Sequence, residues 1–513
     1  MTISLLKKLS ICNFLLLAAC IIAACGSEKE EPTPEPTKIE TQTFVLPVKS
    51  EKCDIPITIS PSENWKVLSE VDWIQISPAQ GTKGDGQKIT VNVAENTTQE
   101  ARSGKATIVS ITNPKNIHVS ITINQNAGEV IVPPEEEKDP HAEMKLTATE
   151  IVKNINVGWN LGNTCECGAW TGYTGNIDVE GETLWGNPKT TQAMIDALQA
   201  AGFNAVRIPV RWYAHADKDL NIREAWMNRV KEIVNYAYDK GMYVILNSHH
   251  DNWYDRLPVD YDETDIKTKF ENMWKQIATA FNSYDEHLIF AGINEIIKLN
   301  KDGSEDWGEP TTANWKFANA LLQLFVNTVR ATGGNNELRC LMVQPWAASP
   351  RNALNIKFKI PKDSAEKRLI VEYHCYDPYN YAIGKDNAVN NQWAQHEVKE
   401  SDLNEISTLF DKLNTTFVEN GIPCIMAEFG STQDNSYSKG NDAADQIRAD
   451  YHKFIVSEAK KYNIPGFYWD NGNFNGKATA TQNCENFGLL DRKTCTFPAR
   501  AQVALQGIMD GIK

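Results

Sequence analysis

Eight short apolar runs, each followed by a stretch with helical periodicity, most constrain how this 513-residue chain can fold. The runs have the length of buried strands, and the stretches between them are amphipathic. Apolar runs that alternate with helices predict parallel βα units, and eight such units predict a closed (β/α)8 barrel rather than an open sheet. The predicted strands are 156–162, 205–210, 243–250, 288–295, 339–346, 369–376, 423–430 and 466–470.

A smaller domain precedes the barrel. Residues 39–128 alternate apolar and polar residues at period two, with Gly, Asn and Pro between the runs, which predicts a small all-β sandwich. Trp65, then Trp73 followed by SPAQG, then a late Gln125 resemble the BACON domain, an immunoglobulin-like module common in carbohydrate-degrading lipoproteins. We interpret both tryptophans as core anchors of the sandwich, with sugar stacking as the alternative.

The first 25 residues predict a lipoprotein signal peptide. Two lysines precede an apolar stretch, and Ile22-Ala23-Ala24-Cys25 resembles a lipobox, so we expect lipidation at Cys25. The predicted location is the outer membrane of a Gram-negative bacterium, on the cell surface, held by the lipid anchor alone. Acidic, Pro-rich linkers at 26–38 and 129–143 flank the sandwich, and the barrel is expected over 144–513.

The composition excludes several classes of partner. The net charge of −15, with acidic residues spread along the chain, argues against nucleic acid and against a basic membrane-binding patch. The eleven cysteines form no CxxC pair and no zinc-ligand spacing. Adjacent residues of a strand point to opposite faces, so His249 and His250 are not expected to share a metal ion. We therefore expect no metal, no cofactor and a monomer.

Two predicted strands end in a carboxylate. The run 288–295 ends in Asn294-Glu295, and the run 423–430 carries Glu428 near its end. Only a closed, repeating fold brings these distant residues together, and barrel enzymes place catalytic groups at strand ends. Cleavage of a glycosidic bond needs two carboxyl groups, one on each side of the anomeric carbon. Other chemically active residues at predicted strand ends are Arg207, His249, His250, His374, Tyr376 and Trp469.

The motifs GWNLGNT, VILNSHHD, HLIFAGINE, HCYDPY, AEFG and YWDNG, in this order, resemble cellulase-type glycoside hydrolase family five. The resemblance covers nearly all of 146–513 and implies an α/β fold of the TIM barrel type. It implies that Glu295 is the acid/base and Glu428 the nucleophile. It also implies that the shared active-site residues are Arg207, His249, Asn294, His374, Tyr376 and Trp469. Two departures, Ile296 where proline is usual and Ala291 where glutamate is frequent, remove no reacting group.

The implied roles lead to expectations about charge. Arg207 and the hydroxyl of Tyr376 favour the ionised form of Glu428, as a nucleophile requires. We expect the pKa of Glu295 to be raised, partly by the charge of Glu428, so that Glu295 holds a proton near neutral pH. Asn294 is expected to bind the sugar 2-hydroxyl, His249, His250 and His374 to orient other groups, and Trp469 to form the floor of the subsite.

The predicted function is endo-acting hydrolysis of β-1,4-glucan with retention, on cellulose-like glucan, mixed-linkage glucan or xyloglucan. A β-mannanase of the same fold and a non-catalytic glycan-binding surface lipoprotein are the alternatives. Fold alone does not distinguish these functions; the two carboxylates favour an enzyme. Six tryptophans in or near loops on the catalytic side are candidates for lining an open cleft, namely Trp170, Trp185, Trp253, Trp307, Trp346 and Trp393.

Overall fold

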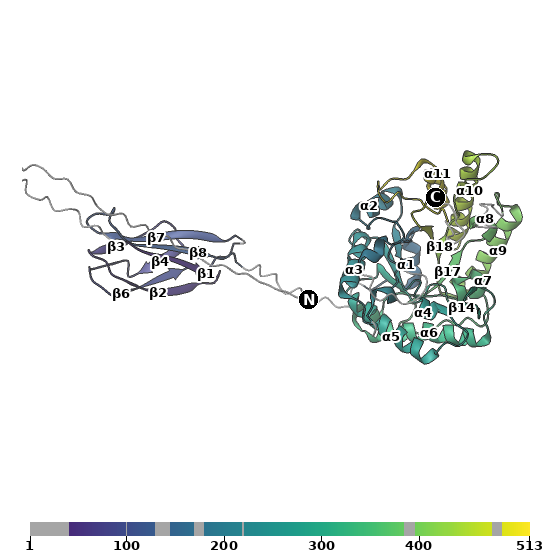
Figure 1. The fold of residues 1–513 in the computed structure, drawn as a ribbon, viewed down its shortest axis with the longest axis horizontal. Coiled ribbons are helices and arrows are strands. Elements are labelled where there is room, and N and C mark those ends of the chain that lie inside the picture. Colours follow the sequence, from purple (N-terminus) through teal and green to yellow (C-terminus); the bar gives the residue numbers. More distant parts are fainter. Residues whose placement is uncertain are drawn as a thin grey trace, which may run out of the picture. The chain divides into compact units, whose positions relative to one another are not determined.

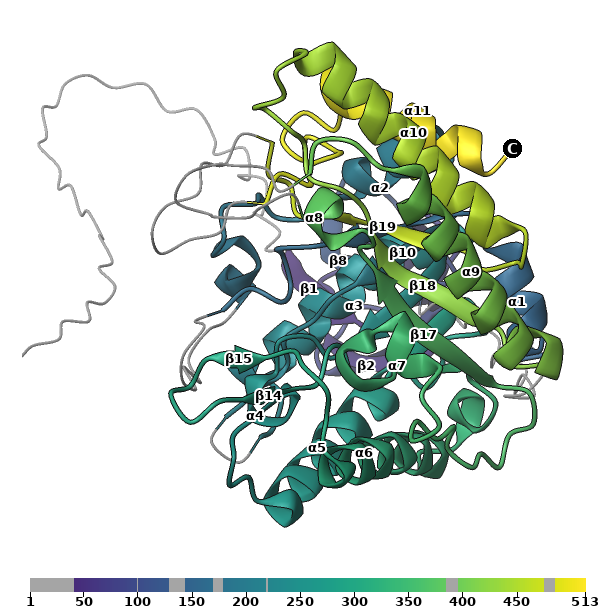
Figure 2. The same cartoon turned by 90° about the vertical axis from the view of Figure 1, so that its right-hand side faces the viewer.

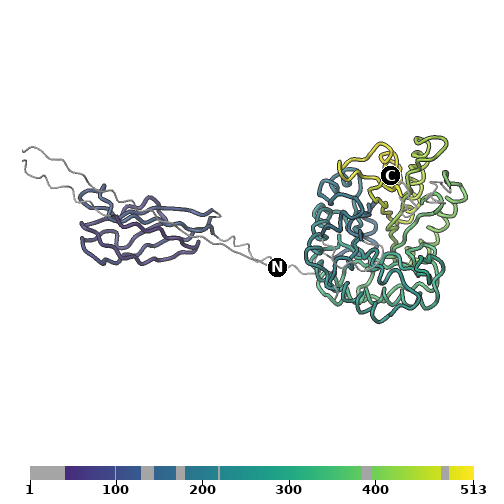
Figure 3. Tube along the Cα trace, in the orientation of Figure 1, coloured from purple at the N-terminus to yellow at the C-terminus, as the bar shows by residue number. Residues whose placement is uncertain are grey.

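The computed structural model describes residues 41–98, 100–128, 144–168, 179–217, 220–383, 395–474 and 485–513. The predicted signal peptide, both linkers and Cys25 lie outside these residues. The chain divides into two compact units, Met1–Glu136 and Glu137–Lys513 (Figures 1 and 3). No helix among the described residues is long and apolar enough to cross a membrane.

The second unit is the predicted closed barrel. Its eight parallel strands follow the order β10-β11-β13-β16-β17-β18-β19-β9, and each matches one predicted run (Figure 2). The strands are β9 (Gly158–Leu161), β10 (Ala205–Ile208), β11 (Tyr243–Asn247), β13 (Leu288–Ala291), β16 (Leu341–Val343), β17 (Leu369–Cys375), β18 (Cys424–Phe429) and β19 (Gly466–Asp470).

Helices surround the barrel and connect its strands. The predicted helix stop at Gly202 is confirmed, because this glycine ends its helix in the left-handed conformation at φ 109°. Threonine capping boxes begin the first helix and the long helix after β13. The helices are α1 (Ala148–Asn154), α2 (Gln192–Ala201), α3 (Glu224–Tyr238), α4 (Asn252–Asp255), α5 (Glu263–Ala280), α6 (Thr312–Ala331), α7 (Pro350–Ala353), α8 (Tyr379–Ala382), α9 (Glu400–Thr416), α10 (Asn441–Lys460) and α11 (Ala499–Gly511).

Strand alternation divides the apolar residues of the barrel into two clusters. Val244 and Leu246 of β11 face the helices, whereas Ile245 faces the barrel interior. The interior cluster includes Ile151 and Val152 of α1, so this helix closes one end of the barrel. The other end, where the strands terminate, is left for polar side chains.

The first unit is an all-β sandwich of two sheets, with strand orders β1-β8-β7-β3-β5 and β2-β6-β4. Trp65 is buried at its centre and donates to Gln87 at 3.1 Å, as expected for a core anchor. Trp73 lies half-buried under the guanidinium of Arg102, 4.3 Å from the ring centroid. The strands are β1 (Gln42–Val48), β2 (Cys53–Ile59), β3 (Trp65–Ser69), β4 (Ile74–Ser77), β5 (Gln80–Gly81), β6 (Gln87–Val93), β7 (Arg102–Ser110) and β8 (Ile117–Gln125).

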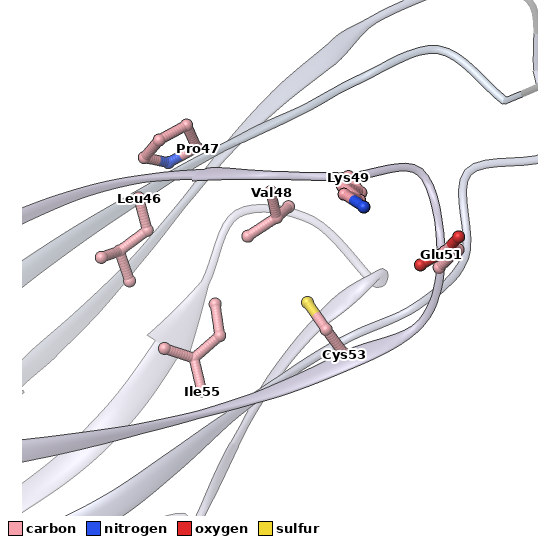
Figure 4. A pocket seen from close by; sticks show the side chains of 7 residues that line it. All are labelled: Leu46, Pro47, Val48, Lys49, Glu51, Cys53 and Ile55. Carbon is pink, nitrogen blue, oxygen red and sulfur yellow. The ribbon is translucent and has the colours of Figure 1, made fainter.

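The two sheets are not closely packed where their edge strands β1 and β2 face each other. The inward-facing side chains there are only half-buried, and they leave a cavity of about 370 Å³ (Figure 4). Its lining contains no aromatic ring on which a sugar could stack. The lining residues are Leu46, Pro47, Val48, Lys49, Glu51, Cys53 and Ile55.

Candidate active site

The two carboxylates lie together at the ends of β13 and β18. A carboxylate oxygen of Glu295, one of Glu428 and a ring nitrogen of His374 all lie within 4.8 Å of one another. Nδ1 of His374 is 2.7 Å from Oε1 of Glu295 and 3.5 Å from Oε2 of Glu428. His374 therefore stands between the two predicted reacting groups.

Glu428 points inward because β18 contains a β-bulge. Along this strand Ile425 and Ala427 face the barrel interior, so strict alternation would turn Glu428 outward. The pairing with β17 shifts register here: Tyr373 opposes Met426, and His374 opposes Glu428. The extra residue, Ala427, lets two consecutive side chains face inward.

Glu428 accepts hydrogen bonds from two predicted partners. Nη1 of Arg207 donates to Oε1 at 2.7 Å, and the hydroxyl of Tyr376 donates to Oε2 at 2.9 Å. Burial raises the pKa of Tyr376 well above its ordinary value, so the phenol stays protonated and remains a donor. Burial also raises the pKa of Glu428, a rise that His374 and Arg207 oppose. The donors on both oxygens thus favour the ionised form of Glu428.

The expectation for the proton on Glu295 is wrong. Burial acts to raise the pKa of Glu295, but the charge and hydrogen bond of His374 outweigh burial, and its pKa falls below the ordinary value. Burial lowers the pKa of His374, but Glu428 and Glu295 outweigh it and raise the pKa to about 9. Without substrate, the proton therefore resides on His374 and is shared with Glu295 through the 2.7 Å hydrogen bond.

A third carboxylate, Glu372, lies beneath the pair and is fully buried. Its Oε1 is 3.2 Å from Nη2 of Arg207 and 3.5 Å from Nε2 of His374, and its Oε2 accepts from Gln344. Sequence reasoning missed Glu372, although strand alternation could have found it: it is two residues before His374 and so shares its face of β17. Sequence reasoning also missed Asn160 of β9, whose side-chain oxygen accepts a hydrogen bond from Arg207 at 2.9 Å.

Asn294 and His249 adjoin this cluster. Oδ1 of Asn294 accepts from Nη2 of Arg207 at 2.8 Å, and its amide nitrogen is 3.4 Å from Nε2 of His249. Burial lowers the pKa of His249 well below its ordinary value, so the ring is neutral at pH 7. The ring stacks on Trp469 at a centroid distance of 5.7 Å and an interplanar angle of 9°. His249 therefore contacts both Trp469 and Asn294.

His250 differs from the expectation. β11 ends at Asn247, so His249 and His250 lie beyond the strand, and alternation does not separate them. His250 adopts φ 55°, and its ring contacts that of His249 at 4.3 Å and that of Trp185 at 6.1 Å. Likewise β13 ends at Ala291, before Asn294 and Glu295.

Among the described residues, the group that could hold a metal ion is Glu295, His374 and Glu428. The guanidinium of Arg207 and the imidazolium of His374 already supply positive charge to these carboxylates.

The tryptophans separate by burial. Trp346 is fully buried and lines no cleft, because a 3-10 turn at Trp346–Ala348 folds it into the core after β16. Trp185 and Trp253 are half-buried, and Trp307 is 48% exposed. Trp170 and Trp393 lie outside the described residues.

The comparisons with known proteins identify the family of the barrel. Residues 162–475 match the model for cellulase, glycosyl hydrolase family 5. The chain belongs to glycosyl hydrolase family 5. It is accordingly a glycoside hydrolase. Residues 41–124 of this hydrolase match the model for the viral BACON domain.

Three similar proteins illustrate the relationship. The chain is 36% identical over 375 residues to Endoglucanase B of Neocallimastix patriciarum, covering 72% of this chain and 73% of that one. It is 32% identical over 472 residues to the xyloglucan-specific endo-beta-1,4-glucanase BoGH5A of Bacteroides ovatus, covering 89% and 90%. The solved structure of a broad-specificity endoglucanase from Ruminococcus champanellensis with bound cellotriose is 37% identical, with a TM-score of 0.62, covering 71% and 98%.

Proposed function

We propose that this protein is a retaining endo-β-1,4-glucanase in which Glu428 is the nucleophile and Glu295 the acid/base. The separation of the two carboxylates is the observation that carries the proposal. Their nearest oxygens lie within 4.8 Å, close to the roughly 5–5.5 Å typical of retaining enzymes. Inverting enzymes separate the two groups by about 6.5–9.5 Å to admit a water molecule.

In the first step Glu428 attacks the anomeric carbon while the glycosidic C–O bond breaks. The leaving oxygen takes the proton that Glu295 and His374 share. As the covalent bond consumes the charge of Glu428, His374 loses one of the two carboxylates that raise its pKa most. The proton is therefore released to Glu295 and the leaving group as the reaction requires it.

In the second step the ionised Glu295 takes a proton from water, and the water oxygen attacks the anomeric carbon and displaces Glu428. Arg207 and Tyr376, which donate to Glu428 in the free enzyme, stabilise it as the departing carboxylate. The amide nitrogen of Asn294 donates to the sugar 2-hydroxyl, and Trp469 supports the reacting ring.

The stereochemistry of the first product tests this mechanism. Proton NMR during early hydrolysis of cellopentaose should show the β-anomer of the new reducing end before mutarotation. An α-anomer would overturn the retaining assignment. Glu295→Ala supplied with azide should yield a β-glycosyl azide, whereas Glu428→Ala should not yield this β-azide. If Glu428→Ala yielded the β-azide and Glu295→Ala did not, the roles of the two carboxylates would be reversed.

We propose β-1,4-glucan of plant cell walls as the substrate, with xyloglucan the first polymer to test. A named xyloglucan-specific relative matches 89% of this chain and therefore also extends over the sandwich unit. Hydrolysis rates should be measured on xyloglucan, mixed-linkage β-glucan, carboxymethylcellulose and glucomannan, with Glu428→Ala as the control. Preference for glucomannan would favour a β-mannanase. Binding without hydrolysis by wild type would favour a glycan-binding lipoprotein.

We also propose that Cys25 carries a lipid that tethers the protein to the outer membrane, and that the protein acts as a monomer at the cell surface. The proposal rests on the lipobox-like segment before Cys25. Radiolabelled palmitate should enter wild type but not Cys25→Ser. Protease added to intact cells should remove the protein if it faces outward.

A further inference from the structure

The loop after Glu295 builds a small sheet at the mouth of the barrel. This sheet joins two strands of the loop, β14 (Ile297–Leu299) and β15 (Glu305–Asp306), to an earlier strand, β12 (Arg256–Leu257). The strand order is β12-β14-β15. β14 begins two residues after Glu295, and β12 follows the end of β11. Both strands thus follow the carboxyl ends of barrel strands, the end that holds the catalytic groups.

Trp307 stands at the end of β15 and is 48% exposed. Its indole N–H donates to Oε2 of Glu305 at 3.0 Å, and the guanidinium of Arg256 lies 5.5 Å from its ring centroid. The polar edge of the indole is therefore satisfied, and one contact fixes the ring. An exposed aromatic surface held in this way is a rigid platform rather than a core residue.

Arg256 joins this platform to the catalytic acid. Its side chain is 7% exposed; its Nε donates to Oε1 of Glu305 at 2.8 Å. Its Nη1 donates to the main-chain oxygen of Glu295 at 2.7 Å. One carboxylate, Glu305, thus holds both Arg256 and Trp307, and Arg256 in turn holds the main chain of Glu295.

Contacts of Lys298 in β14 also hold β14 and β15 together. Nζ of Lys298 lies 2.9 Å from Oδ2 of Asp306 and donates to the main-chain oxygen of Glu309 at 3.0 Å. These contacts hold β14 against β15 on both sides of Trp307. The platform is thus preorganised, so a ligand that stacks on it loses little free energy in ordering the protein.

We propose that Trp307 is a sugar-binding platform on the leaving-group side of the scissile bond, held in register with Glu295 by Arg256. The inference rests on the proposed function, because the acid must stand on the leaving-group side, and the platform extends directly from it. The ligand is a pyranose ring of a β-linked glucan, whose C–H face stacks on the indole.

The test compares substrates with and without sugar on the leaving-group side. Trp307→Ala should lower kcat/KM on cellohexaose and xyloglucan about tenfold, the effect expected for loss of one stacked ring. The same variant should leave kcat/KM on an aryl β-cellobioside within about twofold of wild type. Trp307→Phe should recover part of the loss. Ile356 is another exposed apolar side chain, so Ile356→Ala is the matched control. It should leave kcat/KM unchanged on both kinds of substrate.

The pattern of products gives a second readout. Loss of a leaving-group subsite should move the main cut in cellohexaose toward its reducing end, since fewer units are then held beyond the acid. An equal fall on the aryl cellobioside and on the polymers would overturn the proposal by making Trp307 a structural support of Glu295. A shift toward the non-reducing end, or no change on any substrate, would also overturn it. Wild type inactive on every substrate would instead contradict the proposed function.

Discussion

Glu372→Gln tests whether the buried third carboxylate sets the protonation of His374. The rise in the pKa of His374 from 6.5 to about 9 corresponds to about 3.4 kcal/mol of net stabilisation of the imidazolium. Glu428, Glu295 and Glu372 all act in this direction. Glu372 acts less strongly than Glu428 and Glu295, so removal of its charge should lower the pKa of His374 by less than removal of either of the other two would. Glutamine fills the same volume and can still accept from Arg207.

The measurement is kcat/KM as a function of pH on an aryl β-cellobioside. In wild type, activity should fall as pH rises through about 9, because the proton needed by the leaving group is then lost from His374 and Glu295. In Glu372→Gln this alkaline limb should move to lower pH, by up to about one unit. The loss of charge from the buried pair with Arg207 should also lower the free energy of unfolding by about 3 kcal/mol.

Glu182→Gln provides the matched control. Glu182 is also a buried carboxylate paired with an arginine, Arg229, at 2.8 Å, but it lies outside the catalytic cluster. This variant should be destabilised to a similar extent without a shift of the alkaline limb. An unmoved limb in folded Glu372→Gln, or equal shifts in both variants, would refute the electrostatic reasoning.

Four other outcomes are expected. Tyr376→Phe removes a donor to the ionised Glu428, so its pKa rises further and activity should be lost at a higher pH on acidification, as a pH–rate profile would record. The stability contributed by protonated His374 should be complete below pH 6.5 and lost as pH rises through about 9, which denaturant unfolding at several pH values would measure. Gly507→Ala places a methyl group against the main chain of α10 and should cost about 1–3 kcal/mol of stability without changing kcat per folded molecule. Trp65→Ala should destabilise the sandwich by about 3–5 kcal/mol and leave aryl cellobioside hydrolysis unchanged, as calorimetry and initial rates would show.

The sequence predicted the barrel because its signals are local. Each strand is an apolar run of the right length, and each helix shows its own periodicity and stops, as at Gly202. The alternation of side chains along β17 could also be predicted from the sequence. Val371 and Tyr373 face the helices, so Glu372 and His374 face the interior. The motif HCYDPY begins at His374 and does not include Glu372, which only the alternation of the strand indicates.

The exposed and buried tryptophans could not be separated from sequence. Trp307 and Trp346 both follow barrel strands in loops, and no local pattern distinguishes them. Burial of Trp346 depends on the turn that folds it into the core, and exposure of Trp307 depends on the Glu305 and Arg256 contacts across the small sheet. The hydrogen bond from Arg256 to Glu305 joins residues 49 positions apart.

By itself, the sequence determined the order of strands and helices, the closed barrel and the carboxylates available at its mouth. These features depend on hydrophobic periodicity and residue type, which are properties of short segments of the chain. The tertiary structure decided how those carboxylates work. The bulge at Ala427 turns Glu428 inward against strict alternation, and it depends on pairing with β17. The location of the proton depends on His374 lying 2.7 Å from Glu295 and 3.5 Å from Glu428, since a pKa responds to charge in space rather than to neighbours in the chain.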